Sequence, residues 1–304
     1  MDLNELRARP ELLPTYLFHQ RIRETPVGGG SICQARRLTL EDGASLFAKS
    51  YGGSDPRQDG ERPPESFFET EAAGLRWLGE ATASGGAPVP EVIVVLPDLL
   101  ALAWIEPGEP SPGAAERFGR ELAATHRAGA EAFGAPWPGF IGSLPQDNTL
   151  TPAEQGWAEW FVTRRLEPYL DLAARRQALS PRDVATVRSL LDRVPDLAPP
   201  PEPPARLHGD LWPGNVLWAA DGRAWLVDPA AHGGHRETDL AQLALFGGAP
   251  YLDRILAAYT EAWPLPDGWR ERVPLHQLHL LLVHAALFGA SYRGSVMAAV
   301  AALS

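Results

Sequence analysis

The sequence predicts an α+β protein of two lobes, in which an antiparallel sheet lobe with one helix precedes a larger, mainly helical lobe. Short apolar runs joined by glycine and Asp-Gly turns fill the first hundred residues. After residue 110, apolar residues recur at helical spacing instead. Pro107-Gly108-Glu109-Pro110 separates the two patterns, so we expect the lobes to span residues 1–106 and 107–304.

Three strands and a glycine loop are expected at the start of the first lobe. Glycine lets a backbone approach phosphate groups closely and offer its N–H groups to them. The candidate loop for nucleotide binding is Gly28, Gly29 and Gly30, although three glycines alone are more often a flexible turn. The strands around it are expected at residues 21–25, 32–40 and 46–49, with Glu41-Asp42-Gly43 as the second turn.

Lys49 ends the third strand, where its ammonium group could reach the phosphates of a nucleotide. The segment Ser66–Leu78 has the apolar spacing of a helix and carries Glu69 and Glu71. A lysine at a strand end is usually only solvated, but here a partner is close in sequence. We expect Glu71 to form an ion pair with Lys49.

The next hairpin joins Val92–Val95 to Leu99–Ile105 through a Pro-Asp turn, and the following prolines mark the hinge between the lobes. An edge strand beside the hinge would offer unpaired backbone N–H and C=O groups. On that reading the backbone of Ala103, Trp104 and Ile105 binds adenine. The alternative is an ordinary buried strand.

The second lobe is expected to consist mainly of helices. His126 lies on the apolar face of the first one and is expected to be a packed structural residue. The predicted helices span residues 116–130, 155–175, 181–193, 237–246, 251–263 and 270–302.

The most restrictive pattern in the chain is His208-Gly209-Asp210-Leu211-Trp212-Pro213-Gly214-Asn215, followed by Asp228. Two apolar runs separated by Asp221-Gly222 predict a β-hairpin that brings Asn215 close to Asp228. Phosphoryl transfer from ATP requires a carboxylate beside the attacking hydroxyl and oxygen ligands for Mg²⁺. The spacing therefore predicts a kinase centre in which Asp210 is the base and Asn215 and Asp228 hold Mg²⁺.

Composition narrows the range of partners. The formal net charge of −11 argues against nucleic acid, which normally requires a basic surface. The first residues lack the apolar core of a signal peptide and no membrane-spanning helix is expected, so we predict a cytoplasmic protein. Cys33 is the only cysteine, which excludes an internal disulfide and a structural zinc site built from cysteines.

His232, His235, Glu237 and Asp239 form a second polar cluster, whose spacing could suggest a transition-metal hydrolase. The cluster lies at the expected start of a helix. We therefore favour a structural role, in which Glu237 and Asp239 cap that helix or anchor the catalytic loop through Arg236.

The kinase motif, together with Asp228-Pro-Ala, Gly234-His-Arg-Glu-Thr-Asp-Leu-Ala and Phe246-Gly-Gly, resembles the fructosamine kinases, also called ketosamine-3-kinases. These belong to the protein-kinase-like and aminoglycoside phosphotransferase-like superfamily, and the resemblance spans almost the whole chain. It implies a protein-kinase-like fold and a deglycation repair role. The implied reaction is MgATP-dependent phosphorylation of the 3-hydroxyl of a fructosamine or ribulosamine, either free or on a protein lysine.

The resemblance also implies two substrate-binding residues, Trp212 and His284. The Trp212 indole could cover the sugar or its cationic amine. Positions that are often Asn and His in the family are Val283 and Leu287 here, which could alter sugar preference. A cysteine common in some relatives is Ser31 in this chain, so redox control through that position is not expected.

Two other functions stay open at this point. One is a hydroxyl kinase of the aminoglycoside or choline phosphotransferase type, which would share the catalytic residues. The other is a non-catalytic nucleotide-binding scaffold, which should have lost one of Lys49, Asp210, Asn215 or Asp228. The sequence does not predict which sugar or amine is the acceptor, or the oligomeric state.

Overall fold

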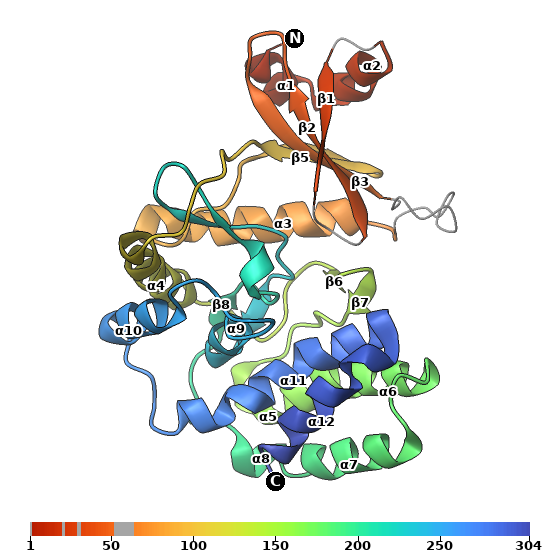
Figure 1. The fold of residues 1–304 in the computed structure, drawn as a ribbon, viewed down its shortest axis with the longest axis vertical. Coiled ribbons are helices and arrows are strands. Elements are labelled where there is room, and N and C mark those ends of the chain that lie inside the picture. Colours follow the sequence, from red (N-terminus) through yellow and green to blue (C-terminus); the bar gives the residue numbers. More distant parts are fainter. Residues whose placement is uncertain (1, 20–21, 29–31, 52–63) are drawn as a thin grey trace.

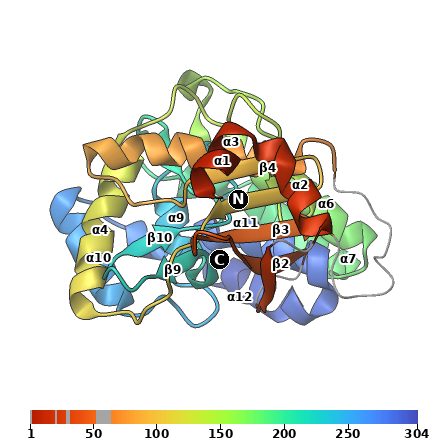
Figure 2. The same cartoon turned by 90° about the horizontal axis from the view of Figure 1, so that it is seen from above.

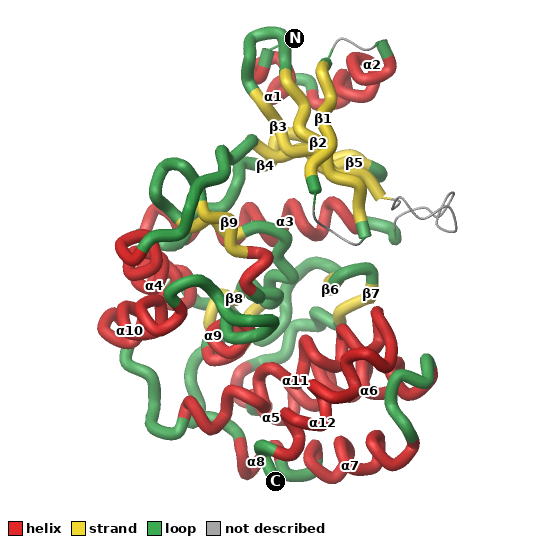
Figure 3. The backbone as a smooth tube through the Cα atoms, in the orientation of Figure 1, coloured by secondary structure: helices red, strands yellow, loops and turns green. Residues whose placement is uncertain are grey.

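The computed structural model describes residues 2–19, 22–28, 32–51 and 64–304. It has the predicted α+β architecture, with strands gathered in the N-terminal part and helices in the C-terminal part (Figure 3). The main sheet has the order β1-β2-β3-β5-β4, and each neighbouring pair is antiparallel. Its strands are β1 (Arg23–Val27), β2 (Cys33–Thr39), β3 (Ser45–Tyr51), β4 (Val92–Leu96) and β5 (Leu99–Ala103).

Helix α3 (Phe67–Glu80) lies along one face of this sheet, between the sheet and the C-terminal helices (Figure 1). Its buried Phe68 and Leu75 share an apolar cluster with Leu100 and Leu102 of β5. Burial of one such side chain contributes roughly 1.5–3 kcal/mol. This packing fixes the position of Glu71 on the same helix.

Helices α1 (Leu3–Ala8) and α2 (Leu13–Phe18) cover the opposite face and were not predicted (Figure 2). Leu6 and Leu13 pack with Leu46 and Ala101 of the sheet. Because successive strand residues point to opposite faces, Ala101 faces these helices while Leu100 and Leu102 face α3. The central strands β3 and β5 are therefore covered on both faces.

Three short two-stranded sheets lie between the main sheet and the C-terminal helices. They pair β6 with β7, β8 with β11, and β9 with β10. Their bounds are β6 (Gly139–Ile141), β7 (Leu144–Gln146), β8 (Ala205–Leu207), β9 (Val216–Trp218), β10 (Ala224–Leu226) and β11 (His232–Gly234). The kinase motif, residues 208–215, lies between β8 and β9, and Asp228 lies two residues after β10.

The C-terminal part is mainly helical, as predicted. Its largest apolar cluster joins α5, α6, α7, α11 and α12, which pack against one another (Figure 1). The helices are α4 (Pro112–Arg127), α5 (Trp157–Phe161), α6 (Glu167–Arg175), α7 (Pro181–Leu191), α8 (Val194–Leu197), α9 (Glu237–Gln242), α10 (Leu252–Ala262), α11 (Trp269–Phe288) and α12 (Arg293–Ala301). The division into lobes at residue 106 stays a prediction.

Two predicted helices are interrupted. The segment expected to be helical over residues 155–175 contains a π-helical stretch, Val162–Leu166, between α5 and α6. The segment expected over residues 270–302 breaks at a 3₁₀ turn, Gly289–Tyr292, between α11 and α12. Gly289 has φ +84°, a conformation that glycine adopts without a Cβ penalty. The break turns α12 back against α11.

One helical segment, Trp269–Ala301, is long and apolar enough to cross a membrane by length and composition. The expectation that no such segment exists was wrong by this measure. However, 56% of its most apolar window is buried inside the protein, and α11 packs against α6, α9 and α12. A core helix meets the same criterion, so this segment is weak evidence for a membrane span.

Candidate functional site

A cleft of about 1110 Å³ lies between the main sheet and the C-terminal part. Lys49 and Glu71 line it from β3 and α3. Asp210, Asn215 and Asp228 line it from the loops around β9 and β10. The cleft therefore brings together the residues predicted to position phosphates, bind metal and accept a proton.

The predicted β-hairpin is present and accounts for this proximity. β9 pairs with β10 so that Val216 faces Leu226. The Val227 N–H donates to the Asn215 carbonyl at 3.1 Å, which continues the ladder by one step. Asp228 directly follows that bond, so the hairpin places it next to Asn215.

Asn215 connects the two aspartates. Its Nδ2 donates to the Asp210 carbonyl at 2.8 Å, to Asp210 Oδ2 at 3.1 Å and to the Asp228 carbonyl at 3.4 Å. Asp228 has φ +53°, a strained backbone conformation of the kind that accumulates at functional sites. These hydrogen bonds join the three residues into one unit.

Burial raises the pKa of Asp210 well above its ordinary value, and the nearby charge of Asp228 raises it further. The Asn215 hydrogen bond acts in the opposite direction and is weaker. Asp210 Oδ1 is buried and has no hydrogen-bond partner. This oxygen is therefore available to accept a proton at the cleft.

Helix α9 anchors the loop that carries Asp210. Asp239 is fully buried and accepts from the backbone N–H of His208 at 2.8 Å and of Gly209 at 2.9 Å. Gln242 accepts from the Leu211 N–H at 2.7 Å and donates to the Gly209 carbonyl at 3.2 Å. The structural role predicted for Asp239 is confirmed by these bonds, whereas Gln242 was missed.

Two further contacts support the same loop. His126 is buried, as predicted, with Nε2 at 3.1 Å from Asp239 Oδ2 and Nδ1 at 2.8 Å from the Tyr259 hydroxyl. Gly209 has φ +83°, and a Cβ there would lie 2.3 Å from the Ala230 carbonyl oxygen. Only glycine fits this position in the loop.

The predicted link through Arg236 is wrong. The Arg236 guanidinium forms two hydrogen bonds of 2.7 Å with Glu202 and donates to the carbonyls of Trp263 and Pro264. It therefore ties the proline-rich segment 199–204, which leads into β8, to the segment after α10. The carboxylate of Asp239 holds the loop directly.

Lys49 lies between two carboxylates. Its Nζ is 2.5 Å from Glu71 Oε2 and also pairs with Asp228. Of the two glutamates considered, Glu71 is therefore the partner, as predicted. Burial raises the pKa of Glu71 to about 7, against the opposing effect of Lys49. Burial alone would raise the pKa of Asp228, but the neighbouring Lys49 holds it below the ordinary value.

The expectation of an edge strand at the adenine end is wrong. β5 is paired on both sides, with β3 and with β4. The Ala103 N–H donates to the Glu91 carbonyl at 2.8 Å, and the Trp104 N–H donates to the Ser45 carbonyl at 3.2 Å. Ala103, Trp104 and Ile105 do line the cleft. Within the described residues, the Ile105 N–H is the one of these three that donates to no backbone carbonyl.

The glycine loop is described only in part. Gly28 lines the cleft, and a Cβ there would meet no atom within 4 Å. Gly29 and Gly30 lie outside the described residues. Cys33 also lines the cleft, and burial raises the pKa of its thiol to about 11.

Beyond Asp210, the cleft continues into an aromatic region. Trp212 and His284 both lie there, as predicted. Phe246 lies between them, with ring centroids 5.9 Å from Trp212 and 4.7 Å from His284. No role was predicted for Phe246, Phe288 or Tyr292, although Phe246 belongs to the Phe246-Gly-Gly motif.

The metal cluster considered from the sequence is not brought together as a whole. His235 and Glu237 do lie close to His276, with possible ligand atoms within 4.8 Å of one another. Both Glu237 oxygens, however, accept hydrogen bonds from Arg272 at 2.7 and 2.8 Å. Asp239 holds the catalytic loop instead, and the His232 Nδ1 lies 2.8 Å from the Ala230 carbonyl. The group is therefore best explained as a buried ion-pair network.

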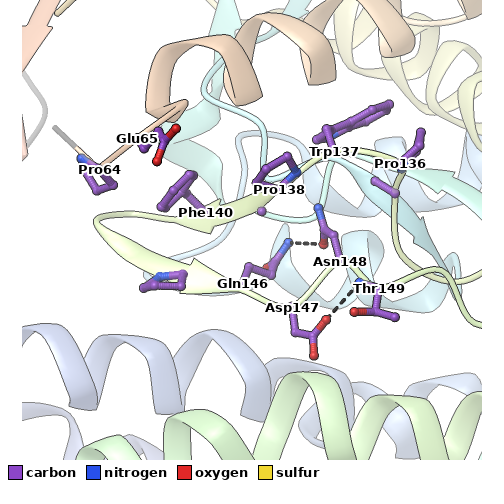
Figure 4. A pocket seen from close by; sticks show the side chains of 13 residues that line it. Pro64, Glu65, Pro136, Trp137, Pro138, Phe140, Gln146, Asp147, Asn148 and Thr149 are labelled. Atoms are coloured by element: carbon purple, nitrogen blue, oxygen red, sulfur yellow. Dashed lines mark hydrogen bonds between the residues drawn. The ribbon is translucent and has the colours of Figure 1, made fainter. Parts of the chain in front are cut away.

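A second, shallower pocket of about 680 Å³ lies around the β6–β7 hairpin (Figure 4). Trp137, Phe140 and several prolines line it, together with the Gln146–Asn148 hydrogen bond of 3.3 Å and Asp147, which accepts from the Thr149 N–H. It contains none of the predicted site residues. The larger cleft is therefore the candidate active site.

Comparisons with known proteins agree with this assignment. Residues 16–303 match the family model described as fructosamine kinase. A probable ketoamine kinase of Thermus thermophilus is 38% identical over 243 residues, which are 79% of this chain and 84% of that protein. The crystal structure of a protein from Thermobifida fusca named putative fructosamine-3-kinase has 49% identity and a TM-score of 0.84, covering 93% of each chain.

The structural likeness extends to proteins with much lower sequence identity. An aminoglycoside phosphotransferase, solved as a ternary complex with ADP and hygromycin B, has a TM-score of 0.59 at 15% identity. It covers 96% of this chain and 98% of its own. At that identity the similarity concerns the fold, which is that of the protein-kinase-like phosphotransferases.

Proposed function

This chain belongs to the fructosamine kinase family of phosphotransferases, and from that premise we propose that it transfers the γ-phosphoryl group of MgATP to the 3-hydroxyl of a ketosamine. A ketosamine is a ketose joined to an amine, as in fructosamine or ribulosamine. The observation that supports the proposal most strongly is the Asp210–Asn215–Asp228 unit facing Lys49 across one cleft.

Asp210 is the proposed base. Its Oδ1 has no hydrogen-bond partner, while Oδ2 is held by Asn215. The raised pKa makes this carboxylate a better proton acceptor than an exposed aspartate. In the reaction the substrate oxygen forms a bond to the γ-phosphorus, the bond from that phosphorus to ADP breaks, and the hydroxyl proton moves to Asp210.

Lys49 and Glu71 are the proposed phosphate-positioning pair. The 2.5 Å ion pair holds the lysine on β3, at the cleft side of the sheet. An ammonium group at that place attracts phosphate oxygens, and removing its partner would let the side chain move away. The Ile105 N–H is the remaining backbone donor proposed for adenine, and Gly28 is proposed to lie beside the phosphates.

The residues predicted to bind metal fit Mg²⁺. Asn215 and Asp228 offer amide and carboxylate oxygens, the ligands that hard divalent cations prefer. The Asn215 nitrogen is occupied by its three hydrogen bonds, which leaves the amide oxygen for the metal. When bound, Mg²⁺ supplies charge neutralisation to the phosphates.

Trp212 and His284 are proposed to contact the sugar or its amine. Trp212 follows Asp210 by two residues, so an acceptor hydroxyl at the base lies within reach of the indole. A cytoplasmic location and the absence of a nucleic-acid partner stay predictions that rest on composition.

The proposal is tested by coupled ADP release with MgATP and a fructose-lysine or ribose-lysine ketoamine, beside an aminoglycoside panel and a control without acceptor. Turnover on the ketoamine is expected. Turnover only on an aminoglycoside would keep the catalytic roles and refute the ketosamine assignment. No turnover on any acceptor would favour a nucleotide-binding scaffold.

Substitution of the base separates catalysis from binding. Asp210→Asn should abolish turnover, because an amide cannot accept the hydroxyl proton, while nucleotide binding measured by calorimetry survives. A variant with near-normal kcat would show that Asp210 is not the base.

A further inference from the structure

The acceptor end of the cleft is unusually poor in charge. We define the aromatic end as the cleft residues beyond Asp210, namely Trp212, Phe246, Leu280, Val283, His284, Leu287, Phe288 and Tyr292. Among the described residues that line the cleft, the charged ones are Lys49, Glu71, Asp210 and Asp228. All four belong to the catalytic and phosphate end. The described lining of the aromatic end therefore contains no cation to pair with a carboxylate.

The rings of the aromatic end form a continuous wall. His284 lies at its centre, with ring centroids 4.7 Å from Phe246, 5.0 Å from Tyr292 and 5.5 Å from Phe288. Trp212 extends the wall from Phe246 toward the base. A flat substituent on the acceptor would meet ring surface along most of this wall.

Two of these rings are exposed. Phe246 is 43% exposed and Phe288 is 46% exposed, so they are among the few large apolar side chains that the described surface leaves open. Apolar groups gathered in a concave site mark a place where a ligand excludes water. An apolar substituent bound at the aromatic end would therefore bury the exposed surface of Phe246 and Phe288.

The position of Phe246 is set by its backbone. Phe246 has φ +52°, an unfavourable conformation for a non-glycine residue, and Gly247 and Gly248 follow at φ +99° and +80°. Such strain persists where the surrounding structure imposes it and is frequent at ligand sites. The turn holds the ring at the cleft wall instead of letting it fold into the core.

His284 is the polar group at the centre of the wall. Its Nδ1 lies 2.8 Å from the Leu280 carbonyl, so Nδ1–H donates and Nε2 is left as an acceptor. Burial lowers the pKa of this imidazole below its ordinary value, which keeps it neutral near pH 7. A neutral acceptor suits a hydroxyl or a protonated amine and gives no attraction to a carboxylate.

We propose that the preferred acceptor is the ketosamine of an amine that carries an apolar aromatic ring and no carboxylate. The aromatic ring of this amine packs against Phe246, Phe288 and Tyr292. This inference rests on the ketosamine kinase function proposed above and names its substrate class. Ketosamines formed on an α-amino group are poor acceptors, because the carboxylate next to the sugar-bearing nitrogen would enter an apolar region without a cationic partner. A ketosamine on the ε-amino group of lysine holds its carboxylate away from that region.

Three matched acceptors test the proposal: the fructosamines of benzylamine, methylamine and glycine. The benzyl compound adds a ring to the methyl compound, and the glycine compound adds a carboxylate. We expect kcat/KM for benzyl to exceed that for methyl by about tenfold or more, since burial of apolar groups discriminates on this scale. Glycine should fall below methyl by a similar factor.

A flat profile, with the three values within about twofold, would overturn the inference while leaving the ketosamine kinase function intact. A preference for glycine would overturn it as well and would indicate a cationic partner. Turnover of a lysine ketoamine but of none of the three would overturn the inference alone. If neither the three nor a lysine ketoamine is phosphorylated while another hydroxyl acceptor is, the proposed function fails and the inference falls with it.

Two variants test where the aromatic ring of the acceptor packs. Phe288→Ala should reduce the ratio of benzyl to methyl kcat/KM by about fivefold or more, because it removes ring surface that is open to the cleft. Leu150→Ala is the control, since Leu150 is also 46% exposed but is not part of the cleft lining. An unchanged ratio in Phe288→Ala would overturn the proposed position of the ring.

Discussion

Replacing Asp239 tests whether α9 holds the catalytic loop in place. In Asp239→Asn one carboxylate oxygen becomes an NH₂ group, which cannot accept a hydrogen bond. The carboxylate accepts from the His208 N–H through Oδ2 and from the Gly209 N–H through Oδ1. An asparagine keeps at most one of these bonds and turns a donor toward the other N–H.

The magnitude follows from the burial of the site. Asp239 is fully buried, and the backbone N–H left without an acceptor has no access to water as a substitute. An unsatisfied buried donor costs about 1–3 kcal/mol. We therefore expect the free energy of unfolding to fall by about that amount, and kcat to fall because Asp210 follows the loosened segment directly.

Urea denaturation of the wild type and Asp239→Asn measures the first effect, and steady-state ADP release measures the second. Asp253→Asn is the control, because Asp253 also lies in the first turn of a helix but is exposed. A change in unfolding free energy below about 0.5 kcal/mol in Asp239→Asn, with kcat unaltered, would refute the reasoning, since surface substitutions already produce changes of that size.

Gly209→Ala should lower the unfolding free energy more than Gly222→Ala does. Both glycines have positive φ, but a Cβ at Gly209 would lie 2.3 Å from the Ala230 carbonyl oxygen, whereas a Cβ at Gly222 would meet no atom within 4 Å. Equal urea midpoints for the two variants would contradict the steric argument. Asp228→Ala should weaken nucleotide binding strongly with Mg²⁺ present and little in EDTA, as measured by calorimetry, whereas an equal loss in both conditions would argue against a metal ligand. The contribution of buried His208, His235 and His276 to stability should fall as pH drops below about 6.5, because their pKa values are lowered and the unfolded chain takes up the protons that the folded protein excludes. Glu71, whose pKa is raised to about 7, contributes in the opposite direction over the same pH range. For His235, whose pKa is lowered to about 3, this amounts to about 2 kcal/mol at pH 5. The unfolding free energy of the wild type relative to His235→Asn should therefore fall by about that amount between pH 7 and pH 5, and a difference that does not change with pH would contradict it.

The catalytic centre was largely predictable because its geometry is local. Asn215 and Asp228 flank a two-stranded hairpin whose turn residues and apolar runs are visible in the sequence, and pairing of adjacent strands follows directly. The Lys49–Glu71 ion pair was also predicted, since the strand and helix that carry these residues are consecutive elements. Assignment of their catalytic roles rests on the family resemblance and awaits the experiments above.

The errors concern relations between distant segments. β5 is not an edge strand because it pairs with β3 as well as with β4. Since α3 and β4 separate β3 from β5 in the sequence, no local pattern reveals that pairing. The role expected of Arg236 was wrong because its partner, Glu202, lies 34 residues before it in the sequence. Helices α1 and α2 are short and are stabilised by packing on the sheet, so their sequences alone gave little signal.

The position of Lys49 between Glu71 and Asp228 has a thermodynamic consequence. An ammonium group with two carboxylate partners has one N–H left for a phosphate oxygen, so a second phosphate contact requires one partner to give way. Asp228 is that partner under the proposed mechanism, since it is also the expected metal ligand. When the metal binds Asp228, Lys49 is freed for the nucleotide. The effect of bound nucleotide on metal affinity must equal the effect of bound metal on nucleotide affinity. Metal and nucleotide should therefore each raise the affinity of the cleft for the other by an equal factor.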